Sequence, residues 1–191
     1  MAIDFREDIK RACDILKKGG VILYPTDTVW GLGCDATNSD AVNRVFKIKQ
    51  RIDSKAMIVL LGSDNEIQRY VKEVPEIAYD LVALSVKPLT IVYDKGIYLA
   101  PELLAEDGSV GIRVTKEQFS MSLCKAFRRP IVSTSANISG KLTPAFFDEI
   151  SDEIKAQVDY IVETRRDERI KHKPSSVIKL DCDGTVKILR N

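Results

Sequence analysis

The sequence contains one histidine, His172, among its 191 residues, and this scarcity removes several kinds of catalytic site. A Ser-His-Asp or Cys-His hydrolase would have to use His172 as its base, yet this residue lies in the basic stretch RIKHKPSS, far in sequence from any candidate nucleophile. Metal sites built from several histidines are excluded outright. We expect His172 to be a solvated loop residue, and the chemistry to rest on lysine, arginine, hydroxyl, amide and carboxylate groups.

Cysteines and long apolar runs are also few. The four cysteines, at positions 13, 34, 124 and 182, form no CxxC pair, which argues against a zinc ribbon or a disulfide scaffold and fits a reduced cytoplasm. The longest apolar run covers residues 56–61, too short for a transmembrane helix. The first twenty residues carry charges throughout and lack an apolar signal-peptide region, so we predict a cytoplasmic protein.

The overall composition is that of a folded globular chain. Hydrophobic residues make up 45% and charged residues 30%, and the formal net charge is +1. We find no repeat, low-complexity tract or linker, and therefore predict a single domain over residues 1–191. The near-neutral charge gives no whole-chain field for nucleic acid, although basic residues gather in residues 44–55 and 165–173.

Hydrophobic periodicity predicts strands that alternate with helices. The expected helices cover residues 6–18, 39–50, 66–72, 76–84, 116–127 and 146–158. The expected strands cover residues 21–24, 57–61, 89–93, 110–114, 130–133, 160–162, 177–180 and 186–189. This order is typical of an α/β protein with one mixed sheet.

Two glycine-containing segments imitate nucleotide-binding motifs. GLGCDA, residues 31–36, has the glycine spacing of a dinucleotide fingerprint, but PTDTVW separates it from the preceding strand and the next helix begins only near residue 39. SGKLT, residues 139–143, lacks the upstream glycine and the Ser or Thr after lysine that a P-loop needs. Neither segment therefore predicts the nucleotide-binding motif that it imitates.

Four other segments hold more small polar and cationic residues than an ordinary core would. Arg113 lies in the otherwise apolar strand GSVGIRV, where an unpaired charge would cost several kcal/mol. The remaining residues come from PTDTVWGLG, KIKQRIDSK and STSANISG, and they are Thr26, Thr28, Lys49, Arg51, Lys55, Ser133, Ser135, Asn137 and Ser139. Each segment alone could be a turn, a solvated face or an ion pair. Together they predict a cleft that binds phosphates and a carboxylate.

With these motifs in this order, the sequence resembles the YrdC-like threonylcarbamoyl-AMP synthase family in its single-domain form. The matching blocks are GGVILYPTDTVWGLGCDA, KQR, KPLTIVY, VGIRV, PIVSTSANISG, VDYIV, KPSSVIKL and ILR, which cover nearly the whole chain. The resemblance implies a YrdC/RibB-like twisted mixed α/β sheet with surrounding helices and an open, positively charged concave cleft.

The resemblance also implies an activity. Members of this family are nucleotidyltransferases that make threonylcarbamoyl-AMP and pyrophosphate from L-threonine, bicarbonate or CO2, and ATP. A separate complex then uses the product for threonylcarbamoyladenosine modification of ANN-decoding tRNAs. Because the threonine amine and its carbamate are themselves nucleophiles, such a protein mainly positions reactants and neutralises charge. A histidine-poor composition suits this chemistry.

The family motifs assign a role to each matching residue. Lys49 and Arg51 form the catalytic Lys-x-Arg pair. The implied ATP contacts are Arg51, Lys55, Ser109, Ser135, Asn137, Thr143 and Arg190. The implied threonine contacts are Thr28, Arg113, Ser133 and Ser176. Mg²⁺ is expected to accompany ATP, held chiefly by phosphates and water, because the sequence shows no acidic cage and hence no protein metal site.

Two other functions remain open from the residues. A double-stranded RNA or tRNA-binding module, or a ribosome-maturation module, could use the basic runs and would recognise RNA by shape and phosphate contact. A carbamoyl-transfer relative of the hydrogenase-maturation kind carries this domain beside zinc-finger and acylphosphatase-like regions, which this sequence lacks. The buried-strand Arg113 and the hydroxyl-rich STSAN segment favour a small-molecule pocket over either alternative.

Overall fold

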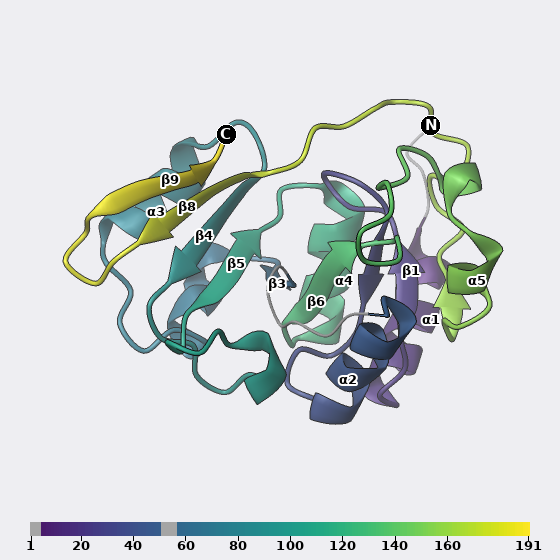
Figure 1. Ribbon diagram of the computed structural model, residues 1–191, viewed down its shortest axis with the longest axis horizontal. Coiled ribbons are helices and arrows are strands. Elements are labelled where there is room, and N and C mark those ends of the chain that lie inside the picture. Colours follow the sequence, from purple (N-terminus) through teal and green to yellow (C-terminus); the bar gives the residue numbers. More distant parts are fainter. Residues whose placement is uncertain (1–4, 51–56) are drawn as a thin grey trace.

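Strands and helices alternate along the chain as the sequence predicts, and they assemble into one twisted mixed sheet (Figure 1). The computed structural model describes residues 5–50 and 57–191. Its α-helices are α1 Arg6–Lys17, α2 Ser39–Ile48, α3 Ile77–Leu84, α4 Gln118–Phe127 and α5 Asp152–Lys155, and its 3₁₀ helices are η1 Asp64–Arg69, η2 Pro101–Leu103 and η3 Phe147–Glu149. Its strands are β1 Ile22–Tyr24, β2 Gly31–Gly33, β3 Ile58–Leu61, β4 Leu89–Tyr93, β5 Val110–Val114, β6 Ile131–Ser135, β7 Tyr160–Ile161, β8 Ser176–Leu180 and β9 Val186–Arg190.

The described residues form nine strands in the order β7-β1-β2-β6-β3-β5-β4-β8-β9. Three neighbouring pairs run parallel, namely β1 with β7, β3 with β5, and β4 with β8, and the other pairs are antiparallel. The sheet is therefore mixed, as predicted. Four strands far apart in the sequence, β6, β3, β5 and β4, lie side by side at its centre.

The helices are amphipathic, and this explains how they cover the sheet. Helix α1 buries Ala12, Cys13 and Leu16 and packs against α4, and the two also contact β1 and β3. Gly19, at a φ of 76°, follows the end of α1 in the left-handed conformation that glycine adopts readily. Asn38 begins α2 by accepting a hydrogen bond from the Ala41 amide at 3.1 Å.

Strand β2 was not expected from the sequence, because GLG resembles a turn. In the structure Gly31 and Gly33 pair with β1 on one side and β6 on the other. A Cβ atom on Gly33 would lie 2.6 Å from the Tyr24 ring and 3.0 Å from the Val132 carbonyl oxygen. Glycine is needed here because neighbouring strands leave no space for a side chain.

Two helix predictions were wrong. Residues 146–158 form only η3 and the short α5, because Ile150 and Ser151 between them have extended backbone angles. Residues 66–72 were expected to be α-helical, but the chain there forms the 3₁₀ helix η1. In the described part of the chain, each helix is too short or too polar to span a membrane.

A long connection, residues 163–175, joins β7 to β8, and we call it the strap. In Figure 1 it is the yellow-green trace that crosses the top of the molecule, from α5 at one side to β8 at the other. In this view (Figure 1) the strap runs along the upper edge of the molecule, above the central strands. Its position matters because these strands carry the candidate site.

Candidate functional site

A cleft of about 620 Å³ lies over the central strands of the sheet, a volume suited to a small-molecule ligand. Its walls come from β3, β4, β5 and β6, the β1–β2 loop and the strap. Seven residues that the sequence assigned to the site line this cleft: Thr28, Ser109, Arg113, Ser133, Ser135, Thr143 and Arg190. The structure therefore brings together residues from segments that span most of the chain.

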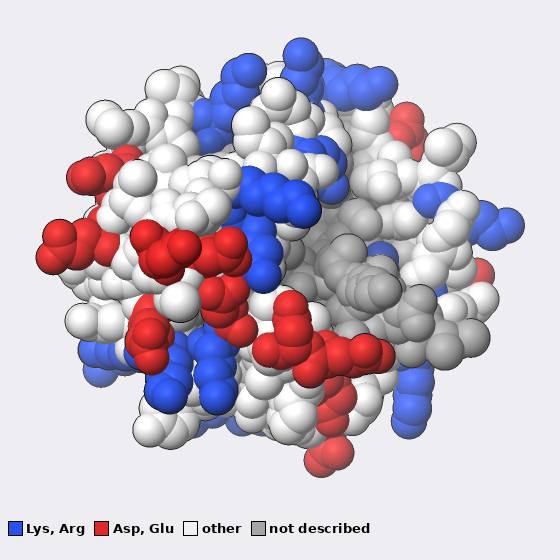
Figure 2. All heavy atoms as spheres, turned by 60° about the vertical axis from the view of Figure 1, so that its left-hand side comes forward, with Lys and Arg blue, Asp and Glu red and all other residues white. Residues whose placement is uncertain are grey.

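The charged side chains at the cleft are cationic. Among the described residues that line it, these are Arg113, Lys171 and Arg190, and no aspartate or glutamate is among them. Figure 2 shows Lys and Arg side chains at the rim of a hollow, with acidic side chains gathered below it. Such a lining favours an anionic ligand.

The β1–β2 loop presents Thr28 to the cleft, and Thr26 holds the loop in shape. The Thr26 hydroxyl donates to the Val29 carbonyl at 2.7 Å and accepts from the Thr28 amide at 3.1 Å. The two threonine hydroxyls lie 3.1 Å apart. Both threonines are buried, so the position of the Thr28 hydroxyl is fixed by the fold.

Arg113 forms a buried ion pair with Asp27, a partner that the sequence analysis did not name. Its Nη2 lies 3.1 Å from Oδ1 of Asp27, and the two side chains are only 5% and 13% exposed. Burial raises the pKa of Asp27, while the positive charge of Arg113 acts in the opposite direction. The acidic residue between the two threonines of PTDT, together with the need of a buried arginine for a partner, was the available signal.

The ion pair with Asp27 leaves part of the Arg113 guanidinium available for other partners. Nε of Arg113 is buried and has no hydrogen-bond partner among the described residues. An arginine presents five donors, so Arg113 can be oriented by Asp27 and still donate to a ligand carboxylate. The two roles considered for this residue, an internal ion pair and a ligand contact, are therefore compatible.

The STSAN segment is split by the structure. Ser133 and Ser135 lie on β6 and line the cleft, whereas Asn137 is not among the lining residues. The Asn137 side chain instead donates to the carbonyls of Ile138 at 3.0 Å and Lys141 at 2.8 Å. In this structure Asn137 stabilises the turn that follows β6.

Lys49 lies behind the same turn and is only 2% exposed. Its Nζ donates to the carbonyls of Ser135 at 2.5 Å and Asn137 at 2.8 Å. Lys49 is not among the described residues that line the cleft, and these two hydrogen bonds hold the STSAN turn in place. Arg51 and Lys55, which the sequence placed beside it, lie outside the described residues.

The serine pair of PSSV is resolved by the strand register. Ser175, not the predicted Ser176, lines the cleft together with Val177, because Ser176 begins β8 and side chains alternate between the faces of a strand. The Ser175 hydroxyl lies 3.0 Å from that of Thr90, and its carbonyl accepts two hydrogen bonds from Arg190 at 2.9 and 3.0 Å. Two adjacent serines give no sequence signal that separates them.

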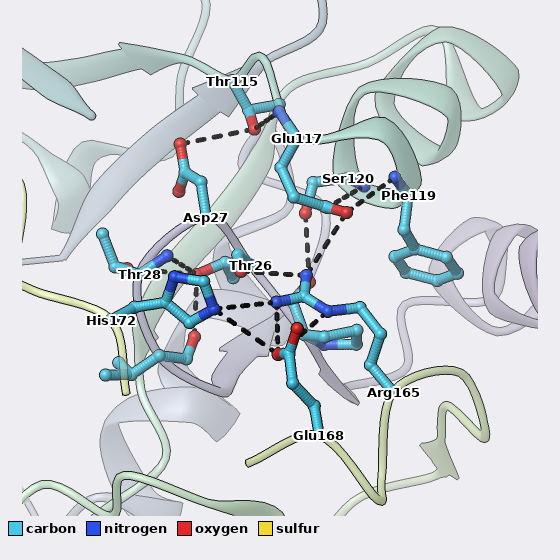
Figure 3. A network of polar contacts seen from close by, with 12 residues as sticks. Thr26, Asp27, Thr28, Thr115, Glu117, Phe119, Ser120, Arg165, Glu168 and His172 are labelled. Atoms are coloured by element: carbon cyan, nitrogen blue, oxygen red, sulfur yellow. Dashed lines mark hydrogen bonds and ion pairs between the residues drawn. The ribbon is translucent and has the colours of Figure 1, made fainter. Parts of the chain in front are cut away.

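His172 lies in a loop, as predicted, but the loop belongs to the cleft wall. Its Nε2 is 3.5 Å from Oε2 of Glu168 and 3.4 Å from Nη2 of Arg165 (Figure 3). One third of the side chain remains exposed. The sequence contained no signal that this loop would line a cleft formed by strands distant in the chain.

The described residues contain no group of three or more His, Cys, Asp and Glu side chains arranged to hold a metal ion. This agrees with the donor types at the cleft, which are hydroxyls, backbone groups and cations. Such a lining does not fit a resident divalent cation, which prefers carboxylate and carbonyl oxygens. The same donors suit phosphate and carboxylate oxygens.

Comparison with known proteins gives consistent matches. The family described as "Telomere recombination", which groups Sua5, YciO and YrdC, matches residues 14–191. The threonylcarbamoyl-AMP synthase of Hahella chejuensis (strain KCTC 2396) is 40% identical over 131 residues, which cover 68% of this chain and 71% of that protein.

Solved structures extend the likeness to the fold. The crystal structure of P. abyssi Sua5 complexed with L-threonine matches with a TM-score of 0.85 at 26% identity; the match covers the whole of this chain but only 55% of that one. E. coli YciO matches with a TM-score of 0.81 at 30% identity, covering 96% of this chain and 88% of that one. The family profile, the sequence relative and the shared fold agree, and the chain belongs to the Sua5/YciO/YrdC family.

Proposed function

We propose that this protein is a threonylcarbamoyl-AMP synthase, which makes threonylcarbamoyl-AMP and pyrophosphate from L-threonine, bicarbonate or CO2, and ATP. The observation that carries the proposal is the single cleft that unites a buried arginine, fixed hydroxyls and further cations. The family relationship and the Sua5 structure that holds L-threonine support the same substrate class.

One end of the cleft suits the amino acid, and we call it the amino-acid end: Thr28, Arg113 and Ser133. Its three side chains are buried. Arg113 would bind the threonine carboxylate through its planar guanidinium, and the hydroxyls of Thr28 and Ser133 would orient the substrate. A small, preformed pocket of this kind fits a small polar molecule.

The other end, which we call the nucleotide end, comprises Ser109, Ser135, Thr143 and Arg190. Thr143 and Arg190 are exposed, and Ser135 is half-buried. These hydroxyls and the guanidinium would contact ATP, with Arg51 and Lys55 as further phosphate contacts. Mg²⁺ would enter with ATP and be held chiefly by its phosphates and by water, consistent with the donor types at the cleft.

The reaction needs two bond-forming steps. The uncharged threonine amine attacks CO2 and loses a proton, which gives the carbamate anion. A carbamate oxygen then attacks the α-phosphorus of ATP, and pyrophosphate leaves with the electron pair of the broken P–O bond. The protein contributes by holding the reactants in line and by offsetting charge on the phosphates.

We further propose that the adenylate is passed to a separate tRNA threonylcarbamoyl-transfer complex and that the reaction occurs in the cytoplasm. An RNA-binding role for the cationic residues is the competing proposal. It predicts affinity that falls steeply with salt, whereas a buried small-molecule site is screened much less. Titration of tRNA at low and high salt separates the two.

The decisive experiment uses the purified protein with ATP, Mg²⁺, L-threonine and radiolabelled bicarbonate. We expect a labelled adenylate and one pyrophosphate per product, both dependent on threonine and bicarbonate. Omission of threonine is the matched control. Formation of ADP and orthophosphate, or pyrophosphate release without threonine, would contradict the proposed function.

A further inference from the structure

Beside the cleft, a network of polar contacts centres on Arg165 of the strap, which lines a small side pocket together with Thr28 (Figure 3). We propose that Arg165 is a positioning residue that fixes the threonine-binding β1–β2 loop against α4 and so sets the affinity for the amino acid. This inference rests on the proposed function, because it assigns Thr28 to threonine.

Arg165 connects three separate segments of the chain. Its Nη1 donates to the Thr26 carbonyl at 3.1 Å and lies 3.2 Å from Oε1 of Glu117. Its Nε and Nη2 both donate to Oε2 of Glu168, at 3.1 and 2.6 Å. The guanidinium therefore binds the β1–β2 loop, the segment that begins α4, and its own strap at once.

Thr26, which accepts a hydrogen bond from Arg165, is in turn bonded to a residue that lines the cleft. The Thr26 hydroxyl bonds the amide of Thr28, whose side chain lines the cleft. On the other side, the Ser120 hydroxyl of α4 donates to the Pro25 carbonyl at 3.0 Å. The loop is thus held at successive carbonyls from two directions, and Arg165 supplies one of these restraints.

Glu117 makes the other end of the network rigid. Its carboxylate caps α4 by accepting from the amides of Phe119 at 3.0 Å and Ser120 at 2.7 Å. Because the helix fixes Glu117, and Glu117 lies against Arg165, movement of the loop relative to α4 would break several charged contacts together. Charge-assisted hydrogen bonds are stronger and more directional than neutral ones.

The backbone of Arg165 indicates that its side chain is needed at this position. Its φ is 66°, in the left-handed region that glycine or asparagine occupies at lower energetic cost. The side chain is only 14% exposed, so the guanidinium is largely removed from water. A lysine could keep the charge but could not reach Thr26, Glu117 and Glu168 with one planar group.

The test is Arg165→Lys, with Arg169→Lys as the matched control. Arg169 lies on the same strap but is 57% exposed and pairs with Asp148. We expect the threonine KM of Arg165→Lys to rise about tenfold or more, as for loss of a hydrogen bond to a charged group, with the ATP KM changed less than about twofold. Arg169→Lys should leave both constants near the parent values.

The single tryptophan gives a second readout that does not depend on turnover. Trp30 is the last residue of the β1–β2 loop and lines a small side pocket together with Thr28 and Arg165. Threonine binding should change its fluorescence, and the midpoint of this titration should shift in Arg165→Lys by the same factor as the KM. Melting temperatures of all variants are recorded without ligand.

The outcomes separate the two proposals. An unchanged threonine KM, or an equal rise in both KM values, would overturn the positioning role. If Arg165→Lys does not fold, Glu168→Gln removes a carboxylate that orients Arg165 and should raise the threonine KM by a smaller factor; no rise would also overturn it. A parent protein that gives neither a threonine-dependent fluorescence change nor turnover would refute the proposed function itself, and this inference with it.

Discussion

The two ends of the cleft are built differently. At the amino-acid end the side chains of Thr28, Arg113 and Ser133 are buried, and Arg113 has an internal ion partner in Asp27. At the nucleotide end Thr143 and Arg190 are exposed, Ser135 is half-buried and Ser109 is buried. The first end is held by an internal ion pair, whereas two of the four side chains at the second are exposed to solvent.

This difference follows from what each end would bind. A small amino acid offers few groups, so affinity depends on accurate placement of a few buried partners. A nucleotide triphosphate is large and highly charged, so several solvent-accessible donors can share the task, each with a smaller effect. Substitutions at the amino-acid end should therefore lower both the stability of the protein and its affinity for threonine. Substitutions at the nucleotide end should mainly lower the affinity for ATP.

The largest effect is expected for Arg113→Met. Removing one partner of a buried ion pair leaves Asp27 as an unpaired buried charge, which costs about 3–5 kcal/mol of unfolding free energy. The double variant Arg113→Met/Asp27→Asn should recover much of this stability, because no charge is then left unpaired. Urea unfolding measures the unfolding free energy of the single and the double variant.

Neither of these two variants should bind threonine, as measured by calorimetry. If the double variant is as unstable as Arg113→Met, the loss of stability does not come from leaving Asp27 without its ion partner. Retained threonine affinity would remove Arg113 from the amino-acid end.

Lys49→Met is expected to have an intermediate effect and to act on the nucleotide side. It leaves the Ser135 and Asn137 carbonyls without the Nζ donor, at a cost of about 1–3 kcal/mol. The ATP KM should rise more than the threonine KM, because Ser135 belongs to the nucleotide end. Lys47→Met, on an exposed residue in the last turn of α2, is the control. Equal changes in the ATP KM of both variants would mean that the effect comes from the loss of a positive charge at the end of α2 and not from the two hydrogen bonds of Lys49.

Asp8→Asn tests how the start of the strap is anchored to α1. Burial opposes ionisation of Asp8, but hydrogen bonds from Glu163, Thr164 and Tyr160 outweigh it and lower the pKa of this carboxyl below its ordinary 3.8. A lowered folded-state pKa contributes stability above pH 3.8, and this contribution is lost as the pH falls through the folded pKa.

Asp8→Asn should therefore be less stable than the parent at pH 7 by about 1–3 kcal/mol, as for a buried polar group that loses charged hydrogen bonds. The difference in unfolding free energy between the variant and the parent should become smaller below pH 3.8. Urea unfolding at pH 7 and pH 3 measures this difference. A difference that stays constant with pH would contradict the lowered pKa.

The smallest effect distinguishes two adjacent serines. Ser175→Ala removes a hydroxyl that contacts Thr90 and Arg190 and should raise a substrate KM severalfold, corresponding to about 1 kcal/mol. Ser176→Ala, on a residue that does not line the cleft, should leave the kinetics unchanged. The reverse result would restore the assignment of Ser176 that the sequence motif suggested.

Much of the fold was predictable because local patterns were strong. Strands β4 and β5 match the expected bounds, and the caps of α1 and α2 follow from Gly19 and Asn38. The family prediction is confirmed by the match over residues 14–191. Strand β2 was missed because a glycine-rich strand carries no side-chain pattern, and its pairing depends on neighbours distant in sequence.

The site was predictable as a set of residues but not as an arrangement. Residue types named Arg113 as a buried cation that needs a partner, yet only the tertiary structure placed Asp27 beside it. Likewise, the motif KQR drew attention to Lys49, but only the fold showed that its ammonium group donates to the backbone carbonyls of Ser135 and Asn137.

The sequence by itself narrowed the class of chemistry: with one histidine, it predicts a site built from lysine, arginine, hydroxyl, amide and carboxylate groups. Tertiary structure decided which of these groups face one another. Residue type sets what a side chain can donate or accept, whereas burial and distance, which decide whether it contacts a ligand or another residue, arise only when strands and loops far apart in the chain come together. Arg165 is an example, because its partners Thr26 and Glu117 lie 139 and 48 residues away along the chain.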